Sequence, residues 1–264
     1  MHLIVASRED EASMSIAGRL LETVDFSEYG DLEGIKVSGD YLFSYIDIKH
    51  LYLENFHELF GNIRDRVEDI IFLSRHSSKA DIKSLTVHPT GNFNGALLGG
   101  REKKLSVSDP GKMTSTLRAM NEFYKGTTFS VTFEATHHGP LLDIPNFFIE
   151  IGTTEQQWTD MDALDTVIHS IMEPNGMAYP AFVGAGGGHY MPKVTRYAIE
   201  NEVDVGHMIS KHSLEGITES MLQQSLEKTP DCKGFILDRK GVKSEPKQLI
   251  LNMADQLGLE IITV

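Results

Sequence analysis

The stretch Asp69-Ile70-Ile71-Phe72-Leu73 is a short apolar run that ends abruptly in the polar segment Ser74-Arg75-His76-Ser77-Ser78. A run that is apolar at successive positions is typical of a β-strand with both faces covered, as in a parallel sheet between two layers of helices. The polar segment would then follow the carboxyl end of a buried strand, which is the edge where open α/β sheets bind their ligands. We therefore expect an α/β fold with functional side chains placed just after its strands.

Segments with helical spacing alternate with strand-like segments along the rest of the chain. Helices are expected at residues 11–24, 110–124, 160–172, 194–199, 219–226 and 245–257, and strands at residues 3–6, 36–37, 41–48, 85–88, 129–135, 147–151, 181–183, 235–237 and 259–264. This alternation favours a mixed, mostly parallel sheet with helices on both faces. Since no repeat or linker interrupts it, we expect a single α/β domain over residues 1–264.

Composition excludes several classes of protein. The chain has 264 residues, of which 41% are hydrophobic, and this is an ordinary globular composition. The single cysteine, Cys232, excludes an internal disulfide and a thiolate-rich zinc site, so a metal would be held mainly by His, Asp and Glu. Apolar stretches are too short to span a bilayer, and the N-terminus has the pattern of a first strand instead of a signal peptide. We expect a soluble, cytoplasmic protein with no membrane partner.

The formal net charge of −14 disfavours non-specific binding to nucleic acid. A nucleic-acid partner would therefore need a small, focused basic area on the surface. Lys and Arg do cluster at residues 101–104 and 239–243, although such clusters are more often plain solvated loops.

Histidine is concentrated in polar segments that follow apolar runs. Besides Ser74–Ser78, these segments are Thr86-Val87-His88-Pro89-Thr90-Gly91-Asn92, Thr136-His137-His138-Gly139-Pro140, Gly186-Gly187-Gly188-His189-Tyr190 and Gly206-His207-Met208-Ile209-Ser210-Lys211-His212. Histidine is a common metal ligand and titrates near neutral pH. Several such segments on loops at strand ends predict one reaction centre assembled from distant parts of the chain. His2, His50, His57 and His169 lie outside these segments and are expected to have structural or surface roles.

The pair His137-His138 is the strongest of these signals, because it directly follows the cleanly alternating segment 129–135. Glu134 and Glu150 each stand in an otherwise apolar strand, and a carboxylate commonly completes or orients a site made of neutral imidazoles. A turn at Gly139-Pro140 would bring both rings to one site. The alternative is a capped loop with one exposed and one hydrogen-bonded histidine.

The other segments allow more than one interpretation. Ser74 near His76 suggests a Ser/His nucleophile, but the chain has no Gly-x-Ser-x-Gly elbow. The glycines that begin at Gly184 resemble the start of a dinucleotide-binding loop, although His189 stands where the third glycine belongs. We expect the amides of these glycines to approach a phosphate or an oxyanion instead of a dinucleotide. The alternative is a tight turn with no ligand. His207 and His212 are five residues apart, which does not place both on one helical face.

Together and in this order, the five histidine segments and the segment Glu150–Trp158 resemble the D-aminoacyl-tRNA deacylase family of the archaeal and plant type. The resemblance extends from the first strand to about His212. It implies a phosphorylase/hydrolase-like α/β fold and a zinc-dependent enzyme that hydrolyses the ester between a D-amino acid and the terminal ribose of tRNA, which is a chiral proofreading reaction. The partner would be the aminoacylated end of D-aminoacyl-tRNA, bound by a monomer.

For this reaction we expect three groups of residues. Zinc, which would lower the pKa of a bound water toward about 7, would be held by some of His76, His88, His137, His138 and Glu150. His189 and Glu134 would transfer protons. Substrate would be bound by Arg75, Gly186, Gly187, Gly188, Lys193, His207, Lys211 and His212, with the glycine amides on the oxyanion and the cations on phosphates.

Two other functions compete with this one. A related α/β phosphorylase or zinc peptidase acting on a nucleoside or a peptide would use a similar sheet and glycine loop. The third hypothesis is a non-catalytic protein that binds a metal or a nucleotide.

Overall fold

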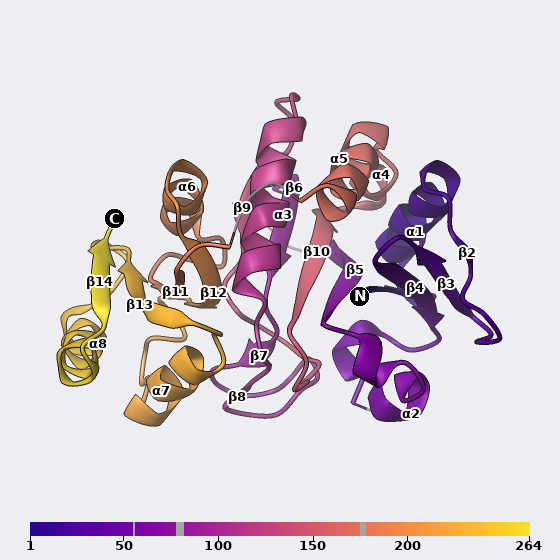
Figure 1. Ribbon diagram of the computed structural model, residues 1–264. Helices are drawn as coiled ribbons and strands as arrows, with labels where there is room; N and C mark the ends of the chain where they lie inside the picture. Colours follow the sequence, from indigo (N-terminus) through magenta and orange to yellow (C-terminus); the bar gives the residue numbers. More distant parts are fainter. Residues whose placement is uncertain (55, 78–81, 175–177) are drawn as a thin grey trace.

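The computed structural model describes residues 1–54, 56–77, 82–174 and 178–264, so Ser78 of the first histidine segment lies outside the described residues (Figure 1). Within this part of the chain the largest sheet has eight strands. In spatial order they are β2 (Ser27–Glu28), β3 (Ile35–Ser38), β4 (Tyr41–Ile46), β1 (His2–Ser7), β5 (Asp69–His76), β10 (Asn146–Gly152), β6 (Ser84–His88) and β9 (Ser130–Phe133).

A second sheet has four strands in the order β12 (Asp204–Ile209), β11 (Ala181–Ala185), β13 (Cys232–Leu237) and β14 (Glu260–Thr263), and β7 (Gly91–Asn92) pairs with β8 (Lys104–Leu105). All neighbours in the four-stranded sheet are parallel. In the larger sheet β4, β1, β5 and β10 are mutually parallel, whereas β6 runs antiparallel to β10 and β3 antiparallel to β4. The predicted mixed, mostly parallel α/β fold is confirmed.

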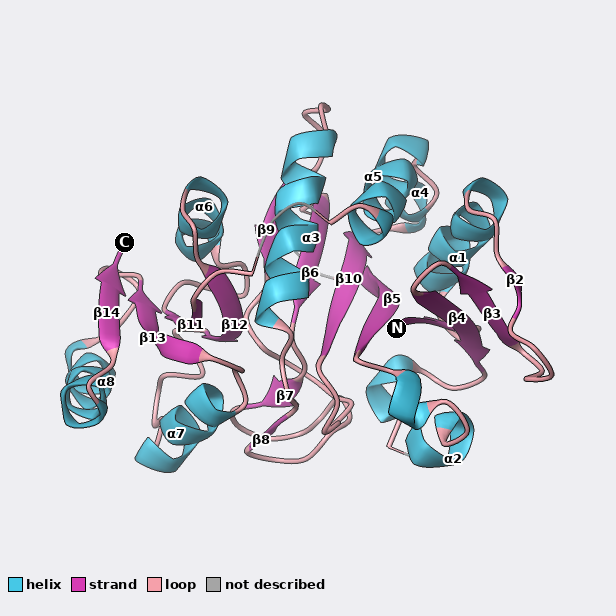
Figure 2. Ribbon diagram, viewed as in Figure 1, coloured by secondary structure: helices cyan, strands magenta, loops and turns pink. Residues whose placement is uncertain are grey.

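Helices cover both faces of the sheets (Figure 2). One face of the eight-stranded sheet packs against α1 (Glu11–Thr23), α3 (Pro110–Phe123) and α5 (Met161–Met172), with α4 (Glu155–Trp158) beside them. The opposite face is covered by the short helices η1 (His50–Tyr52), α2 (Phe56–Phe60) and η2 (Arg64–Arg66). The four-stranded sheet lies between α6 (Pro192–Glu200) and the pair α7 (Glu219–Glu227) and α8 (Ser244–Leu257).

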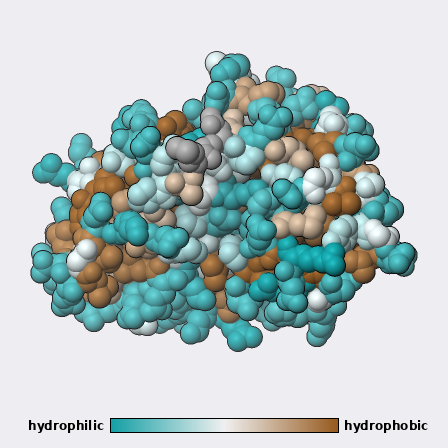
Figure 3. Space-filling model, viewed as in Figure 1, coloured by the Kyte–Doolittle hydropathy of each residue, from teal (hydrophilic) through white to brown (hydrophobic). Residues whose placement is uncertain are grey.

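The surface follows from these layers. Hydrophilic residues cover most of the face shown in Figure 3, and hydrophobic residues gather at its left, over the four-stranded sheet. Among the described residues, no helix is long and apolar enough to cross a bilayer.

The face under η1 and α2 changes character along its strands. Ile70 and Phe72 of β5 and Phe148 of β10 lie in the apolar core beneath the short helices. At the next positions on the same face, two residues further along each strand, stand Ser74 and Glu150, both buried. Because side chains alternate across a strand, this switch places a buried polar area directly beside an apolar one.

The two sheets are joined by the residues after β9. The amide of Ala135 donates to the carbonyl of His189, and the amide of Thr136 donates to the carbonyl of Met208 in β12. Glu134, on the other side of this segment, donates its amide to Val87 of β6. The segment is thus hydrogen-bonded to the larger sheet at one end and to the smaller sheet at the other.

Most predicted elements are present, with ends displaced by a few residues. Three differences matter for the site. β12 lies where only a polar histidine segment was recognised, because Gly206 and His207 interrupt its apolar residues at the centre of the strand. β11 extends through Gly184 to Ala185, so Gly184 belongs to a strand and not to a loop. Finally, β6 and its parallel neighbour β9 both run opposite to β10, so the end of β9, which was expected at the carboxyl edge of the parallel strands, does not lie at that edge, and neither does His88.

We predict that Phe147→Ala, at a fully buried position of β10, lowers the free energy of unfolding by about 3–5 kcal/mol, because the lost ring leaves a cavity between β10 and the helices. Leu257→Ala, at a side chain that is 57% exposed, should change it by less than about 0.5 kcal/mol. Urea unfolding of both variants checks this, and equal losses would contradict the assignment of this core.

Candidate functional site

Five histidines and two glutamates meet on the polar part of the sheet face. They are His76 at the end of β5, His88 at the end of β6, Glu150 in β10, Glu134, His137 and His138 after β9, and His189 after β11. Ligand atoms of His88, His137 and His138 lie within 4.8 Å of one another, and so do those of His76, Glu134 and His189 and those of His88, Glu134 and Glu150. All seven residues predicted for metal binding and proton transfer are therefore brought together.

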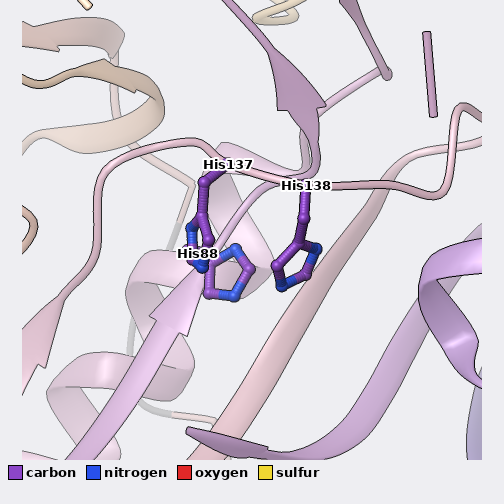
Figure 4. A group of neighbouring side chains, drawn as sticks. All are labelled: His88, His137 and His138. Carbon is purple, nitrogen blue, oxygen red and sulfur yellow. The ribbon is translucent and has the colours of Figure 1, made fainter. Parts of the chain in front are cut away.

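Three imidazoles are held in the same tautomer. Nδ1 of His137 donates to the carbonyl of Ala135 at 2.8 Å, Nδ1 of His138 to that of Gly139 at 2.7 Å, and Nδ1 of His88 to that of Pro89 at 3.1 Å. A ring that donates through Nδ1 keeps the lone pair of Nε2 free. The three rings converge in Figure 4, so three basic nitrogens face one small volume.

His138 reaches this position through its backbone. It has a φ of +45°, in the left-handed region that residues other than glycine rarely adopt. This conformation turns the chain so that His137 and His138, which would point to opposite sides of a regular strand, bring their ring centroids to 4.3 Å from each other. Such strain at a non-glycine residue is typical of functional sites.

The two carboxylates lie between the imidazoles. Oε1 of Glu134 is 2.9 Å from Nδ1 of His76, and its Oε2 is 2.8 Å from Nε2 of His189. Glu150 is 3.5 Å from Nδ1 of His76 and 3.7 Å from Nε2 of His88. Both oxygens of Glu134 are buried and occupied by these short contacts, whereas Nε2 of His76 and Nε2 of His88 are buried and have no hydrogen-bond partner among the described residues. Buried polar atoms without partners are rare, so this cluster is built to receive a further group.

Burial and pairing divide the cluster into charged and neutral residues. Burial lowers the pKa of His137 well below its usual value and that of His138 to about 4, and repulsion from His88 acts in the same direction. Burial would also lower the pKa of His76, but Glu134 and Glu150 outweigh it and raise this pKa to about 10. Burial raises the pKa of Glu134, yet its contacts with His189 and His76 take it well below the usual value. Burial would lower the pKa of His88 too, but Glu150 and Glu134 outweigh it and raise this pKa. Without a bound ion, His137 and His138 are thus neutral, beside a His76 imidazolium, a Glu134 carboxylate and a His88 whose protonated form is favoured.

A cavity of about 440 Å³ opens onto this cluster. One wall is formed by His76, His137, His138, Glu150 and His189, and a second by the charged and hydroxyl side chains of Glu9, Asp10, Lys49, Ser74, Arg75 and Ser77. Leu51, Tyr52 and Leu98 form an apolar third wall. The size is that of a small-molecule site with a few convergent polar groups.

Asp10 and His50 also line this cavity, and neither was predicted as a site residue. Asp10 caps α1, and its carboxylate accepts hydrogen bonds from the hydroxyl of Ser74 and the amide of Arg75. His50 is buried against Phe72 and Phe148, and burial lowers its pKa to about 4. Neither residue lies in a histidine segment, so the only available signal was the helix cap at Asp10.

The glycine loop is not part of the cavity. The amide of Gly186 donates to Ile209, so it is not free for an oxyanion. A Cβ at Gly186 would lie 2.9 Å from Cβ of Asp238, and one at Gly241 would lie 2.4 Å from the amide nitrogen of Gly187. These glycines therefore allow the loops after β11 and β13 to pack closely, and Gly187 and Gly188 do not line the histidine cavity.

Most residues predicted to bind substrate lie elsewhere as well. Arg75 does line the cavity, with its guanidinium 5.4 Å from the ring of Trp158. Lys193 pairs with Asp238 at 2.6 Å, and Lys211 lines a separate cavity beside α8. His212 is exposed and does not line the histidine cavity. His207 is fully buried in β12, with Nδ1 3.1 Å from the hydroxyl of Thr136 and Nε2 2.9 Å from the carbonyl of Ser106. The structure does not bring these four residues to the cluster.

Residues 63–262 match the family model described as D-aminoacyl-tRNA deacylase. A protein of Thermoplasma acidophilum named D-aminoacyl-tRNA deacylase is 47% identical over 265 residues, which cover 100% of both chains. One of the same name from Thermococcus kodakarensis is 34% identical over 99% of both chains. The crystal structure of a conserved protein of unknown function has a TM-score of 0.91 at 31% identity, and the match covers 100% of this chain and 95% of that one.

The burial of His207 predicts that the free energy of unfolding falls at acidic pH. Burial lowers its pKa in the folded state from 6.5 to about 4, so protonation favours the unfolded chain. The contribution of neutral His207 to the free energy of unfolding is complete above pH 6.5. It declines as the pH falls toward 4, by at most roughly 3 kcal/mol. His207→Gln should flatten this decline, measured by urea unfolding between pH 7 and 4. Parallel curves for the two proteins would contradict a neutral His207.

Proposed function

The chain belongs to the D-aminoacyl-tRNA deacylase family, and we propose that it hydrolyses the ester of D-aminoacyl-tRNA to free D-amino acid and tRNA with a zinc ion held by His88, His137 and His138. The chain is a hydrolase of this family. The observation that carries the proposal is the shared tautomer of these three imidazoles, each with Nδ1 on a backbone carbonyl.

The residues present fit a zinc ion. Neutral imidazole nitrogens and carboxylates are preferred zinc ligands, and ligating histidines usually donate their other ring nitrogen to a carbonyl or carboxylate. A cation would also give a partner to the buried Nε2 of His88. When bound, zinc would supply a water of lowered pKa and polarise the ester carbonyl.

We assign proton transfer to His189, held by Glu134. Its side chain is 43% exposed at the cavity, whereas the carboxylate 2.8 Å from its Nε2 is completely buried. A buried carboxylate orients an imidazole and stabilises its protonated form, as in catalytic triads. His189 would take a proton from the attacking water and return it to the ribose oxygen that leaves.

We assign stabilisation of the oxyanion, which was predicted for the glycine amides, to His76. Its contacts with Glu134 and Glu150 raise its pKa to about 10, so it is an imidazolium near neutral pH. Its Nε2 has no hydrogen-bond partner among the described residues and belongs to a side chain that lines the cavity. A fixed cationic donor in a buried site stabilises the negative charge that develops on an ester oxygen during attack by water.

The activity test is release of amino acid from D-tyrosyl-tRNA by the zinc-loaded protein, with L-tyrosyl-tRNA measured in parallel. We expect release from the D-ester and at least about ten-fold less from the L-ester. His189→Ala should lower kcat by about 10²–10⁴-fold, because it removes the group that transfers the proton. The proposal fails if the loaded protein releases no D-amino acid.

Metal analysis tests the zinc ligands separately from activity. We expect His138→Ala to weaken zinc binding by at least about 10–100-fold, which is the cost of removing a partner that merely orients a ligand. The matched control is His57→Ala, at an exposed histidine of α2 outside the cavity, which should bind zinc like the wild type. Equal zinc affinity in all three proteins would show that His138 is not a zinc ligand and would contradict the proposed site.

A further inference from the structure

The apolar wall of the cavity has no role in the chemistry above. We name it the mouth platform and define it as Leu51, Tyr52 and Leu98. Tyr52 is 51% exposed and Leu98 is 54% exposed, so both are large apolar side chains at the opening of the cavity. Apolar side chains that line a cavity together with a few polar groups are typical of a ligand-binding site.

Close backbone packing holds the platform in place beside His138. A Cβ on Gly99 would lie 1.9 Å from the carbonyl oxygen of Leu51, and one on Gly139 would lie 2.4 Å from the same oxygen. The amide of Gly139, which follows His138, donates to the carbonyl of Leu98 at 2.9 Å. Only glycine allows these three segments to approach so closely. The platform is therefore fixed relative to the histidine cluster.

Cations adjoin the platform. Lys49 is the residue before η1, and the amide of Tyr52 donates to its carbonyl, so both side chains leave the same tight turn. Lys49 and Arg75 also line the cavity. An aromatic ring and two cations that line the same cavity can bind a nucleotide of a single strand, with the base on the ring and the phosphate on the cations.

We propose that the adenine of the terminal nucleotide of tRNA stacks on Tyr52 and Leu98, with its 5′-phosphate at Lys49 and Arg75. This inference rests on the proposed function, since an ester carbonyl at the histidine cluster is joined through one ribose to that base. The platform thus sets the position of the ester, and its contacts are the same whichever amino acid is attached.

The test measures binding without turnover. The probe is the uncharged trinucleotide CCA, titrated calorimetrically into the wild type and into Tyr52→Ala, Leu98→Ala, Tyr52→Phe and Leu97→Ala. We expect Tyr52→Ala to raise the Kd by about 5–100-fold, the range for loss of one stacked base, and Leu98→Ala to raise it less. Tyr52→Phe retains the ring and should bind within about two-fold of the wild type. Leu97, the next residue, is 94% exposed and does not line the cavity, so Leu97→Ala is the matched control.

Two results would overturn the proposal. One is a Kd for CCA that is the same in Tyr52→Ala and the wild type. The other is an effect of Tyr52→Ala on KM that appears with D-tyrosyl-tRNA but not with D-alanyl-tRNA, which would assign the platform to the amino-acid side chain. Failure of the proposed function can be distinguished from failure of this inference. In the first case CCA would still bind through Tyr52, but no D-amino acid would be released.

Discussion

The backbone of Ala135 and Thr136 is the constraint on which the site depends. The amide of Ala135 donates to the carbonyl of His189 and that of Thr136 to the carbonyl of Met208 in β12. The amide of the preceding residue, Glu134, donates to the carbonyl of Val87 in β6. This short segment fixes Glu134 before it and His137 after it. β5, β10 and β6 are neighbours in one sheet, so their residues already lie side by side, and this segment adds His189 from the loop after β11.

The charges of the site are tolerated because they are paired. A single buried carboxylate costs several kcal/mol or is protonated, whereas Glu134 stays ionised between His76 and His189. The adjoining apolar residues strengthen these interactions: His88 stacks on Phe148 with an interplanar angle of 9°, at the boundary where the sheet face changes from apolar to polar. The same boundary separates the core from the cavity, so β5 and β10 bear both core residues and site residues.

Local pattern was enough to find the fold class and the centre of the site. Glu134 and Glu150 were found because a charge in an apolar strand demands a partner, and His137 and His138 because they directly follow an alternating strand. The direction of β6 and the layer formed by residues 50–54 and 56–66 depend on tertiary contacts, so His50 and Tyr52 gave no signal and Asp10 gave only that of a helix cap. The glycine loop misled, because close packing of two loops requires glycine just as phosphate binding does. His207 misled for a similar reason, since a buried, hydrogen-bonded histidine has no distinguishing sequence pattern.

The position of Ala135 and Thr136 between the sheets also couples two equilibria. If the four-stranded sheet separated from the larger one, the bonds to His189 and Met208 would break and His189 would leave the cluster. Any ligand that needs the complete cluster must therefore favour the joined state. Binding at the site and contact between the two sheets are thermodynamically linked, so a ligand that occupies the site also stabilises the junction of the sheets.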